Sequence, residues 1–541
     1  MSDRWYEAAV FYELYLRAYQ DSNGDGHGDL RGAIERLDHV KSLGVDCIWI
    51  MPMYPSPLKD DGYDVADYYD IHSDYGTLED FKAFLDAAHE RGLRVVTDLV
   101  MNHTSDQHHW FQEARRDPQS PYHDYYVWSE TGKEYADARI IFLDYETSNW
   151  TYDEVAGKYY WHRFYSSQPD LNYDNPAVHE EMFNIIRFWL DMGVDGFRAD
   201  AVPYLYEREG TNCENLPETH LFLKKVRKMM NEEYPGRVLI AEANQWPEDV
   251  LPYFGEGDQF HMCFHFPIMP RLYMAVKQHD KRPIVDILNR TPDPPEGAQW
   301  LTFLRNHDEL TLEMVTTEER QWMWEQYAPD PRMRLNLGIR RRLAPLLDGD
   351  RRKWLLLHAL LLSLPGAPIV YYGDEIGMGD NIWLEDRHGV RTPMQWSAEK
   401  NAGFSDADET YLPVIESDEY GYKKVNVARQ EQDPDSYLWA TRYLLRARKN
   451  CPELQHGSMS WHPTESNSVL AYWRELDDKR TLCIMNLDNK PASLSLDLRQ
   501  HGDGRIVDLL DEEYSRQISD WPAVLQLRPY ACHWLRFTEA A

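Results

Sequence analysis

The sequence predicts an α/β protein built on a (β/α)₈ barrel, with a segment inserted after the third strand and a C-terminal antiparallel β-sandwich domain. Short apolar runs rich in β-branched residues alternate with longer helical patterns, as in parallel sheets with helical crossovers. Eight such runs occur, which is the number that closes a barrel. After about residue 452 the pattern changes to short alternating runs, which are typical of an all-β domain.

The predicted barrel strands follow the chain in order. They are expected at residues 10–16, 46–51, 93–99, 194–200, 237–242, 260–266, 299–304 and 367–371. The long uncharged stretch 354–373 is interrupted by His358, Ser363 and a Pro-Gly-Ala-Pro sequence, so it predicts a buried helix and a buried strand, not a membrane span.

Two long segments interrupt the alternation. Residues 104–172 are aromatic-rich and far longer than an ordinary loop, which predicts an inserted subdomain over the barrel mouth. The predicted domains are therefore the barrel at 1–103 and 173–450, the insertion at 104–172 and the β-domain at 451–541. A second excursion, 310–350, leads into basic clusters at 340–342 and 351–353, for which we expect a solvated face or a subunit contact in a homo-oligomer.

Composition excludes several classes of partner. The net charge of -34 repels nucleic acid and anionic membrane surfaces. The six cysteines lack metal-site spacing and are expected to be buried thiols. Because the N-terminus shows no basic region leading into an apolar run, we expect a cytoplasmic protein.

Carboxylates end several of the predicted strands. Asp98, Asp200, Glu242 and Asp308 all fall at strand C-termini, the edge where barrel active sites are assembled. One such residue alone is generally a solvated loop residue or a helix cap. Four at equivalent positions predict an active site.

The local sequences around Asp200 and Glu242 suggest different roles. Arg198 and Asp200 point to the same face of one strand, and the guanidinium favours an ionised carboxylate; taken alone, the two would be read as an ordinary buried ion pair. Glu242 ends the apolar run 238–241, where desolvation raises the pKa of a carboxyl. An ionised and a protonated carboxyl together are what glycosyl transfer with retention requires.

Four stretches, taken together, resemble the α-amylase family of glycoside hydrolases and transglycosylases: DLVMNH at 98–103, GFRAD at 196–200, EAN at 242–244 and NHD at 306–308. The resemblance covers nearly the whole chain. It implies that Asp200 is the nucleophile, Glu242 the acid/base, and Asp308 a carboxylate that holds the glucose ring. It also places His103, Arg198 and His307 in the same sugar subsite.

Further matches extend this subsite. In DDGYD, at 60–64, Tyr63 would stack on the sugar, while Asp60 and the Arg391 of RTPMQW would take its hydroxyls. The run QPDLN, beginning at Gln168, resembles the subgroup that cleaves or rebuilds short α-glucosides. The implied substrate is a small disaccharide, and no organic cofactor is expected.

Longer runs at 204–220, 242–249 and 303–316 resemble members that interconvert maltose and trehalose, so isomerisation is the expected activity. Asn244 and Glu309 are then candidates to hold the second glucose. The alternatives are an oligo-1,6-glucosidase or α-glucosidase, a sucrose isomerase and, from a different class, a catalytically inert heavy chain of an amino-acid transporter. That last class needs a membrane-spanning helix, which the sequence does not predict.

A calcium site is predicted at residues 21–29, where oxygen-bearing side chains alternate with glycines. The opening fits the EF-hand pattern, but Gly32 stands where an EF-hand needs a glutamate, so a true EF-hand is excluded. The alternative is a polar turn. Similar loops in the short-α-glucoside subgroup imply the ligands Asp21, Asn23, Asp25, Asp29 and the carbonyl of His27.

The family resemblance implies a second calcium between the barrel and the insertion. Asn102 and Asp170 match its side-chain ligands. The carbonyls of Tyr204 and Leu205, with Glu207, would complete the shell.

Overall fold

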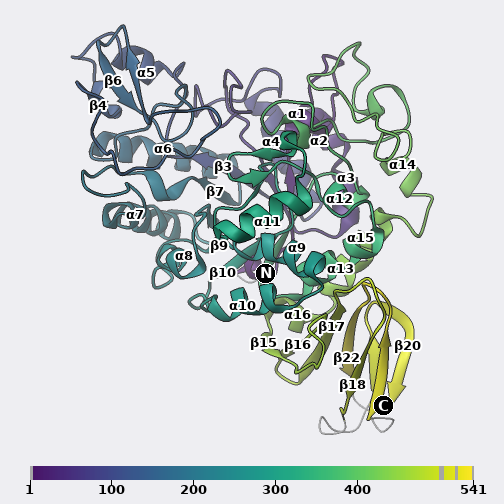
Figure 1. Ribbon diagram of the computed structural model, residues 1–541. Coiled ribbons are helices and arrows are strands. Elements are labelled where there is room, and N and C mark those ends of the chain that lie inside the picture. Colours follow the sequence, from purple (N-terminus) through teal and green to yellow (C-terminus); the bar gives the residue numbers. More distant parts are fainter. Residues whose placement is uncertain (1–3, 499–504, 518–521, 539–541) are drawn as a thin grey trace.

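The computed structural model describes residues 4–498, 505–517 and 522–538. Its centre is a closed barrel of eight strands in the order β1-β14-β10-β9-β8-β7-β3-β2, and every neighbouring pair is parallel (Figure 1). The strands are β1 (Phe11–Leu14), β2 (Cys47–Ile50), β3 (Arg94–Val100), β7 (Gly196–Asp200), β8 (Val238–Ala241), β9 (Met262–Phe264), β10 (Gln299–Phe303) and β14 (Ala367–Tyr371). The predicted barrel is confirmed: seven of the predicted runs contain one of these strands, and the run 93–99 covers all of β3 except Val100.

The main helices begin and end at residues suited to those positions. Asn175 caps α6, Pro176 is its first residue, and Gly193 ends it with a φ of 117°. Thr77 and Asp80 form a capping box on α4. The longer helices are α4 (Leu78–Glu90), α6 (Pro176–Met192), α7 (Pro217–Glu233), α8 (Pro247–Phe254), α9 (Ile268–Gln278), α10 (Arg282–Arg290), α13 (Arg351–Ser363) and α15 (Tyr437–Lys449).

Shorter helices occupy the connections between these elements. They are α1 (Leu16–Tyr19), α2 (Leu30–Glu35), α3 (Leu37–Leu43), α5 (His109–Ala114), α12 (Leu343–Leu346), α14 (Val427–Gln430) and α16 (Pro452–His456). The stretch 354–373, expected to be a buried helix followed by a buried strand, contains most of α13 and all of β14. Among the described residues, no helix has both the length and the apolar character needed to cross a membrane.

The insertion after β3 forms a small lobe, drawn in blue at the upper left of Figure 1. Its antiparallel sheet has the order β4-β6-β5, with β4 (Trp128–Ser129), β5 (Trp150–Asp153) and β6 (Lys158–Trp161). A bridge between His103 and Asp170 ties the end of the insertion to the end of β3. The lobe is thereby attached directly at the barrel mouth.

The excursion after β10 is also folded. It contains β11 (Leu310–Thr311), α11 (Thr317–Tyr327), β12 (Arg334–Leu335) and β13 (Gly338–Ile339). The prediction that its basic cluster forms a solvated or subunit-contact face is wrong for Arg341 and Arg342. Arg342 is fully buried and donates to the carbonyl of Tyr372 over 2.7 Å, while Arg341 pairs with Asp380 at 2.9 Å. Arg342 is internal and Arg341 is half-buried, because acceptors distant in sequence lie beside them.

The C-terminal domain packs two antiparallel sheets against each other. A six-stranded sheet has the order β15-β16-β17-β22-β19-β20, and β18 pairs with β21. The strands are β15 (Ser458–Trp461), β16 (Val469–Leu476), β17 (Lys479–Asn486), β18 (Ala492–Leu496), β19 (Arg505–Asp508), β20 (Asp511–Gln517), β21 (Ala523–Leu527) and β22 (Cys532–Thr538). Apolar residues of both sheets, among them Val469 and Leu496, share one core, as predicted for a sandwich.

Two buried arginines join this domain to the barrel. Arg448 of α15 donates to the carbonyls of Leu362 and Gly366, at the end of α13 and in the turn before β14, and also to that of Leu454 in α16. Arg474 of β16 donates to the carbonyl of Ser363 in the same turn. The six cysteines are free thiols, of which five are buried and Cys532 is half-buried.

Candidate active site

The four predicted carboxylates meet at the C-terminal edge of the barrel. Asp98 lies in β3, Asp200 ends β7, Glu242 follows β8 directly, and Asp308 lies in the segment after β10. Asp200, Glu242 and Asp308 line one cavity of about 120 Å³. The cavity is small compared with typical ligand clefts.

Arg198 lies beneath this cavity and holds the carboxylates together. It is 1% exposed, and its two terminal nitrogens lie 2.6 Å from Asp200 Oδ1 and 2.6 Å from Glu242 Oε1. It also pairs with Asp98, which accepts a further bond from Trp49 over 2.8 Å. Arg198 therefore orients the carboxylates from behind and does not itself line the cavity.

Burial perturbs the two candidate catalytic groups in the same direction but to different extents. Desolvation raises the pKa of Glu242 to about 7 and that of Asp200 to about 6, although Arg198 opposes both shifts. Asp200 thus loses its proton before Glu242 does. The sequence interpretation considered only the effect of Arg198 on Asp200 and missed this contribution of burial.

Tyr63 and His307 form one wall of the cavity. Their rings stack with centroids 5.3 Å apart, and the Tyr63 hydroxyl lies 2.8 Å from His307 Nε2. His307 Nδ1 contacts Glu13, and its Nε2 lies 3.0 Å from Asp308. Burial lowers the pKa of His307, but these carboxylates outweigh that effect and raise it to about 9. This wall therefore presents a charged imidazolium. His103 also lines the cavity.

The structure adds Arg387, which the sequence interpretation missed. Arg387 lines the cavity and bridges Asp60, at 2.5 Å, and Asp308, at 2.8 Å. Gln168 donates to the other oxygen of Asp60 over 2.9 Å from outside the cavity. The one feature of the sequence that could have suggested a site role for Arg387 is its position four residues before Arg391, which was predicted to bind the sugar.

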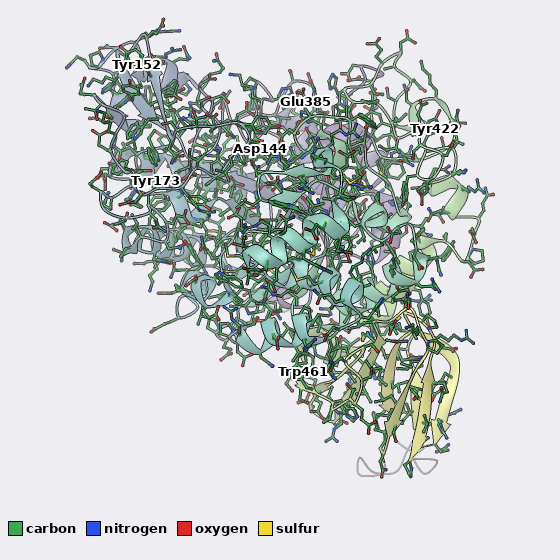
Figure 2. All side chains as sticks on the ribbon, viewed as in Figure 1. Asp144, Tyr152, Tyr173, Glu385, Tyr422 and Trp461 are labelled. Carbon is green, nitrogen blue, oxygen red and sulfur yellow. The ribbon has the colours of Figure 1, made fainter. Side chains whose placement is uncertain are left out.

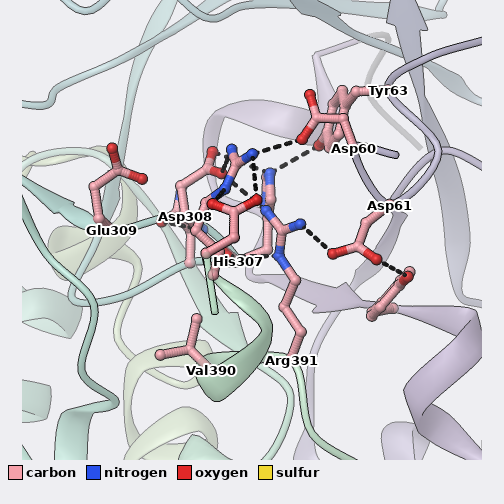
Figure 3. Close-up of polar contacts among 12 residues, drawn as sticks. Asp60, Asp61, Tyr63, His307, Asp308, Glu309, Val390 and Arg391 are labelled. Atoms are coloured by element: carbon pink, nitrogen blue, oxygen red, sulfur yellow. Dashed lines mark hydrogen bonds and ion pairs between the residues drawn. The ribbon is translucent and has the colours of Figure 1, made fainter. Parts of the chain in front are cut away.

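Arg391 itself lies behind Asp308. Figure 3 shows it between Asp61, at 2.6 Å, and Asp308, at 3.0 Å. Its side chain is fully buried and does not line the cavity. Arg391 therefore fixes the orientation of Asp308, whereas Arg387 presents donors to the cavity.

The opposite end of the cavity carries polar groups suited to a second sugar. Asn244 donates to Thr311 over 3.2 Å, and among the described residues its side-chain oxygen is buried without a partner. Glu309 accepts from Asn336 over 3.2 Å, and burial raises its pKa to about 7. The two predicted second-sugar residues thus share this end with Thr311.

The insertion and the excursion touch each other above this end. Arg139 of the insertion binds Glu313 of the excursion at 2.6 Å and Glu214 of the barrel at 2.8 Å. Asp144 accepts from the backbone of Asn336 over 2.8 Å, and Figure 2 shows Asp144 reaching from the insertion toward the centre of the molecule. Together these contacts join the insertion to the excursion at the barrel mouth.

The 21–29 loop is organised by its own carboxylates. Asp21 accepts from the backbone of Asn23 and Gly24, Asp25 accepts from that of His27, and Asp29 caps α2. Within the described ranges, no three His, Cys, Asp or Glu side chains are placed to hold a metal. Any calcium shell would therefore also need amide and carbonyl oxygens, which are ordinary calcium ligands.

The second predicted metal site contains three buried oxygens that lack a partner among the residues the structure describes. They belong to Asn102, Asp170 and Glu207. Desolvation raises the pKa of Asp170 to about 8, and burial together with Asp170 raises that of Glu207. Tyr204 and Leu205 lie three and two residues before Glu207, at the end of a short 3-10 turn. An uncompensated carboxylate pair of this kind fits a cation.

Comparisons with known proteins agree with this geometry. Residues 13–457 match the alpha amylase catalytic domain, and residues 460–534 match the maltogenic amylase C-terminal domain. The trehalose synthase/amylase TreS of Mycobacterium tuberculosis is 56% identical, over 99% of this chain and 90% of that protein. The trehalose synthase of a Pimelobacter species is 54% identical, over 99% and 96%.

Among solved structures, the trehalulose synthase MutB from Pseudomonas mesoacidophila is similar over 99% of both chains, with a TM-score of 0.78 and 28% identity. Mutants of MutB have been solved in complex with glucose and with isomaltulose. The chain therefore belongs to the α-amylase family of glycoside hydrolases, within its trehalose synthase group.

Proposed function

We propose that the protein interconverts maltose and trehalose by intramolecular transfer of a glucosyl group. The observation that carries this proposal is the Arg139 bridge, which joins the insertion, the excursion and the barrel beside a small cavity that holds both the carboxylate pair and the polar groups at its far end. A site that retains the released glucose and excludes water favours transfer to that glucose over hydrolysis.

In the first step, Asp200 attacks the anomeric carbon of the non-reducing glucose. The glycosidic bond breaks, and Glu242 gives its proton to the departing oxygen. The glucosyl group is now an ester of Asp200. Asp308, Arg387 and the charged His307 hold its hydroxyls, while the Tyr63 ring packs on its apolar face.

In the second step, the freed glucose turns within the cavity so that its anomeric hydroxyl faces the ester carbon. Glu242 takes the proton of that hydroxyl as the new bond forms and the ester breaks. Asn244 and Glu309 hold the glucose while it turns. Two inversions at the transferred carbon leave it in the α configuration, as in maltose.

The proposal is tested by incubating the protein with maltose and identifying the products. Trehalose as the main early product, with little glucose, is the expected result. Glucose as the main product, with no trehalose, would instead assign the protein as an α-glucosidase, which uses the same first step.

We expect a bell-shaped dependence of kcat/KM on pH. Activity should rise as Asp200 ionises near pH 6 and fall as Glu242 ionises near pH 7, since the nucleophile must be charged and the acid protonated. The profile should be measured from about pH 5 to about pH 9 with maltose. With Glu242→Gln and glucosyl fluoride, the alkaline limb should disappear; its persistence would assign that limb to another group.

Calcium is proposed at two places, and neither supplies a reacting group. Asp21, Asn23, Asp25, Asp29 and the His27 carbonyl would hold one ion. Asn102, Asp170, Glu207 and the carbonyls of Tyr204 and Leu205 would hold the other, which is supported by their unpartnered oxygens. Binding of this kind stabilises the folded state by mass action.

Exhaustive chelation should therefore lower the melting temperature, and added calcium should restore it. Separate variants distinguish the sites: Asp25→Asn should abolish part of the calcium response, and Asp170→Asn should abolish the remainder. A melting temperature that does not change while metal analysis shows complete removal would contradict both sites.

A further inference from the structure

A second, larger cavity lies between the barrel and the C-terminal domain. Its volume is about 980 Å³, and it is lined by α13, α15, the turn at residues 42–44 and the loop at residues 528–532. No residue that lines it also lines the catalytic cavity. Its size is at the upper end of the range for small-molecule sites.

The lining of this cavity is basic in a chain whose net charge is -34. Six Arg or Lys side chains line it and no Asp or Glu does. Three of the six are paired with carboxylates outside the lining: Arg442 with Glu431, Lys449 with Asp46, and Arg352 with Asp350.

The other three cations are Arg351, Arg446 and Arg528, for which the described part of the chain provides no carboxylate partner. An anion in the cavity would supply the missing negative charge.

The cavity also offers surface for an organic group. Trp439, on α15, is 41% exposed at the lining, and apolar side chains such as Leu355 and Leu510 lie beside it. The guanidinium of Arg446 lies 5.7 Å from the centre of the Tyr443 ring. Planar, weakly hydrated guanidinium groups next to aromatic rings are suited to phosphate with an attached ring.

We propose that this cavity binds a phosphorylated small molecule, with the phosphate on Arg351, Arg446 and Arg528 and the organic part against Trp439. A nucleic acid or an anionic membrane is disfavoured because the strongly negative remainder of the protein would repel an extended anion. A small anion is attracted mainly by the positive side chains of the cavity, because the negative residues elsewhere on the protein are farther from it.

The test measures binding of three probes to the full chain by calorimetry at fixed ionic strength: inorganic phosphate, glucose 6-phosphate and ATP. Uncharged adenosine serves as the control ligand. At least one of the two organic phosphates should bind more tightly than inorganic phosphate. Tighter binding of ATP would identify a nucleotide as the organic part, and tighter binding of glucose 6-phosphate would identify a sugar.

The double variant Arg446→Ala/Arg528→Ala removes two exposed cations and should weaken that binding about ten-fold or more. The matched double variant Arg31→Ala/Arg282→Ala removes the same charge at exposed positions outside the cavity and should bind as the unmodified protein does. Turnover of maltose reports that both variants are folded.

Two results would overturn the proposal. One is the absence of binding by all three probes at millimolar concentration. In that case polyglutamate is measured as a further ligand, and its binding would assign the surface to an acidic protein partner. The other is an equal loss of affinity in both double variants, which would show that net charge alone attracts the anions.

Discussion

Asp200→Asn should reduce turnover of maltose by roughly 10⁴-fold or more, without unfolding the protein. The amide has the shape of the carboxylate but cannot form the glucosyl ester, and Arg198 still has Asp98 and Glu242 as partners. Turnover should be measured on a sample freed from deamidated protein. More than a few per cent of residual activity would rule out Asp200 as the nucleophile.

Glu242→Gln should cause a comparable loss with maltose but a smaller loss with glucosyl fluoride, whose leaving group needs little protonation. Asp200→Asn should show no such rescue, because the ester is required for both substrates. Asp38→Asn is a suitable control, since that carboxylate is 84% exposed and does not line the cavity. It should retain full activity.

Arg139→Ala should change the products of the reaction more than its rate. The substitution removes ion pairs to both Glu214 and Glu313, so the mouth opens more easily and water reaches the ester. Losing a hydrogen bond to a charged group costs about 1.5–3 kcal/mol, and because the Arg139 side chain is 37% exposed we take the lower end, which corresponds to about a ten-fold rise in the ratio of glucose to trehalose. Asn244→Ala and Glu309→Ala should act in the same direction by releasing the second glucose.

Labelled glucose in the medium provides an independent measurement. Early trehalose made by the unmodified protein should contain almost no label, and trehalose made by Arg139→Ala should contain more. Arg208→Ala is the matched control, because Arg208 pairs with Asp174 and Glu218 without bridging the mouth. Equal labelling in all three proteins would show that the Arg139 bridge does not retain the glucose.

The barrel could be predicted from the sequence because each strand is a local pattern of apolar residues, and the catalytic carboxylates because each one ends such a strand. Arg387 could not, because its place in the cavity depends on how the loop before Arg391 folds back over Asp60 and Asp308. The prediction that Arg342 is exposed was wrong for a related reason. A run of three arginines is typical of a surface, and only the tertiary fold brings the carbonyl of Tyr372 to Arg342.

The arginines at the base of the barrel make its closure depend on the neighbouring domain. Arg448 and Arg474 hold the turn that leads from α13 into β14, and β14 is the strand that pairs with β1. Loss of the C-terminal domain would remove Arg474, leaving the carbonyl of Ser363 without this donor beside the strand pair that closes the barrel. We therefore expect the two domains to unfold together, because a residue of the β-sandwich helps to hold the strand that pairs with β1, near the start of the chain.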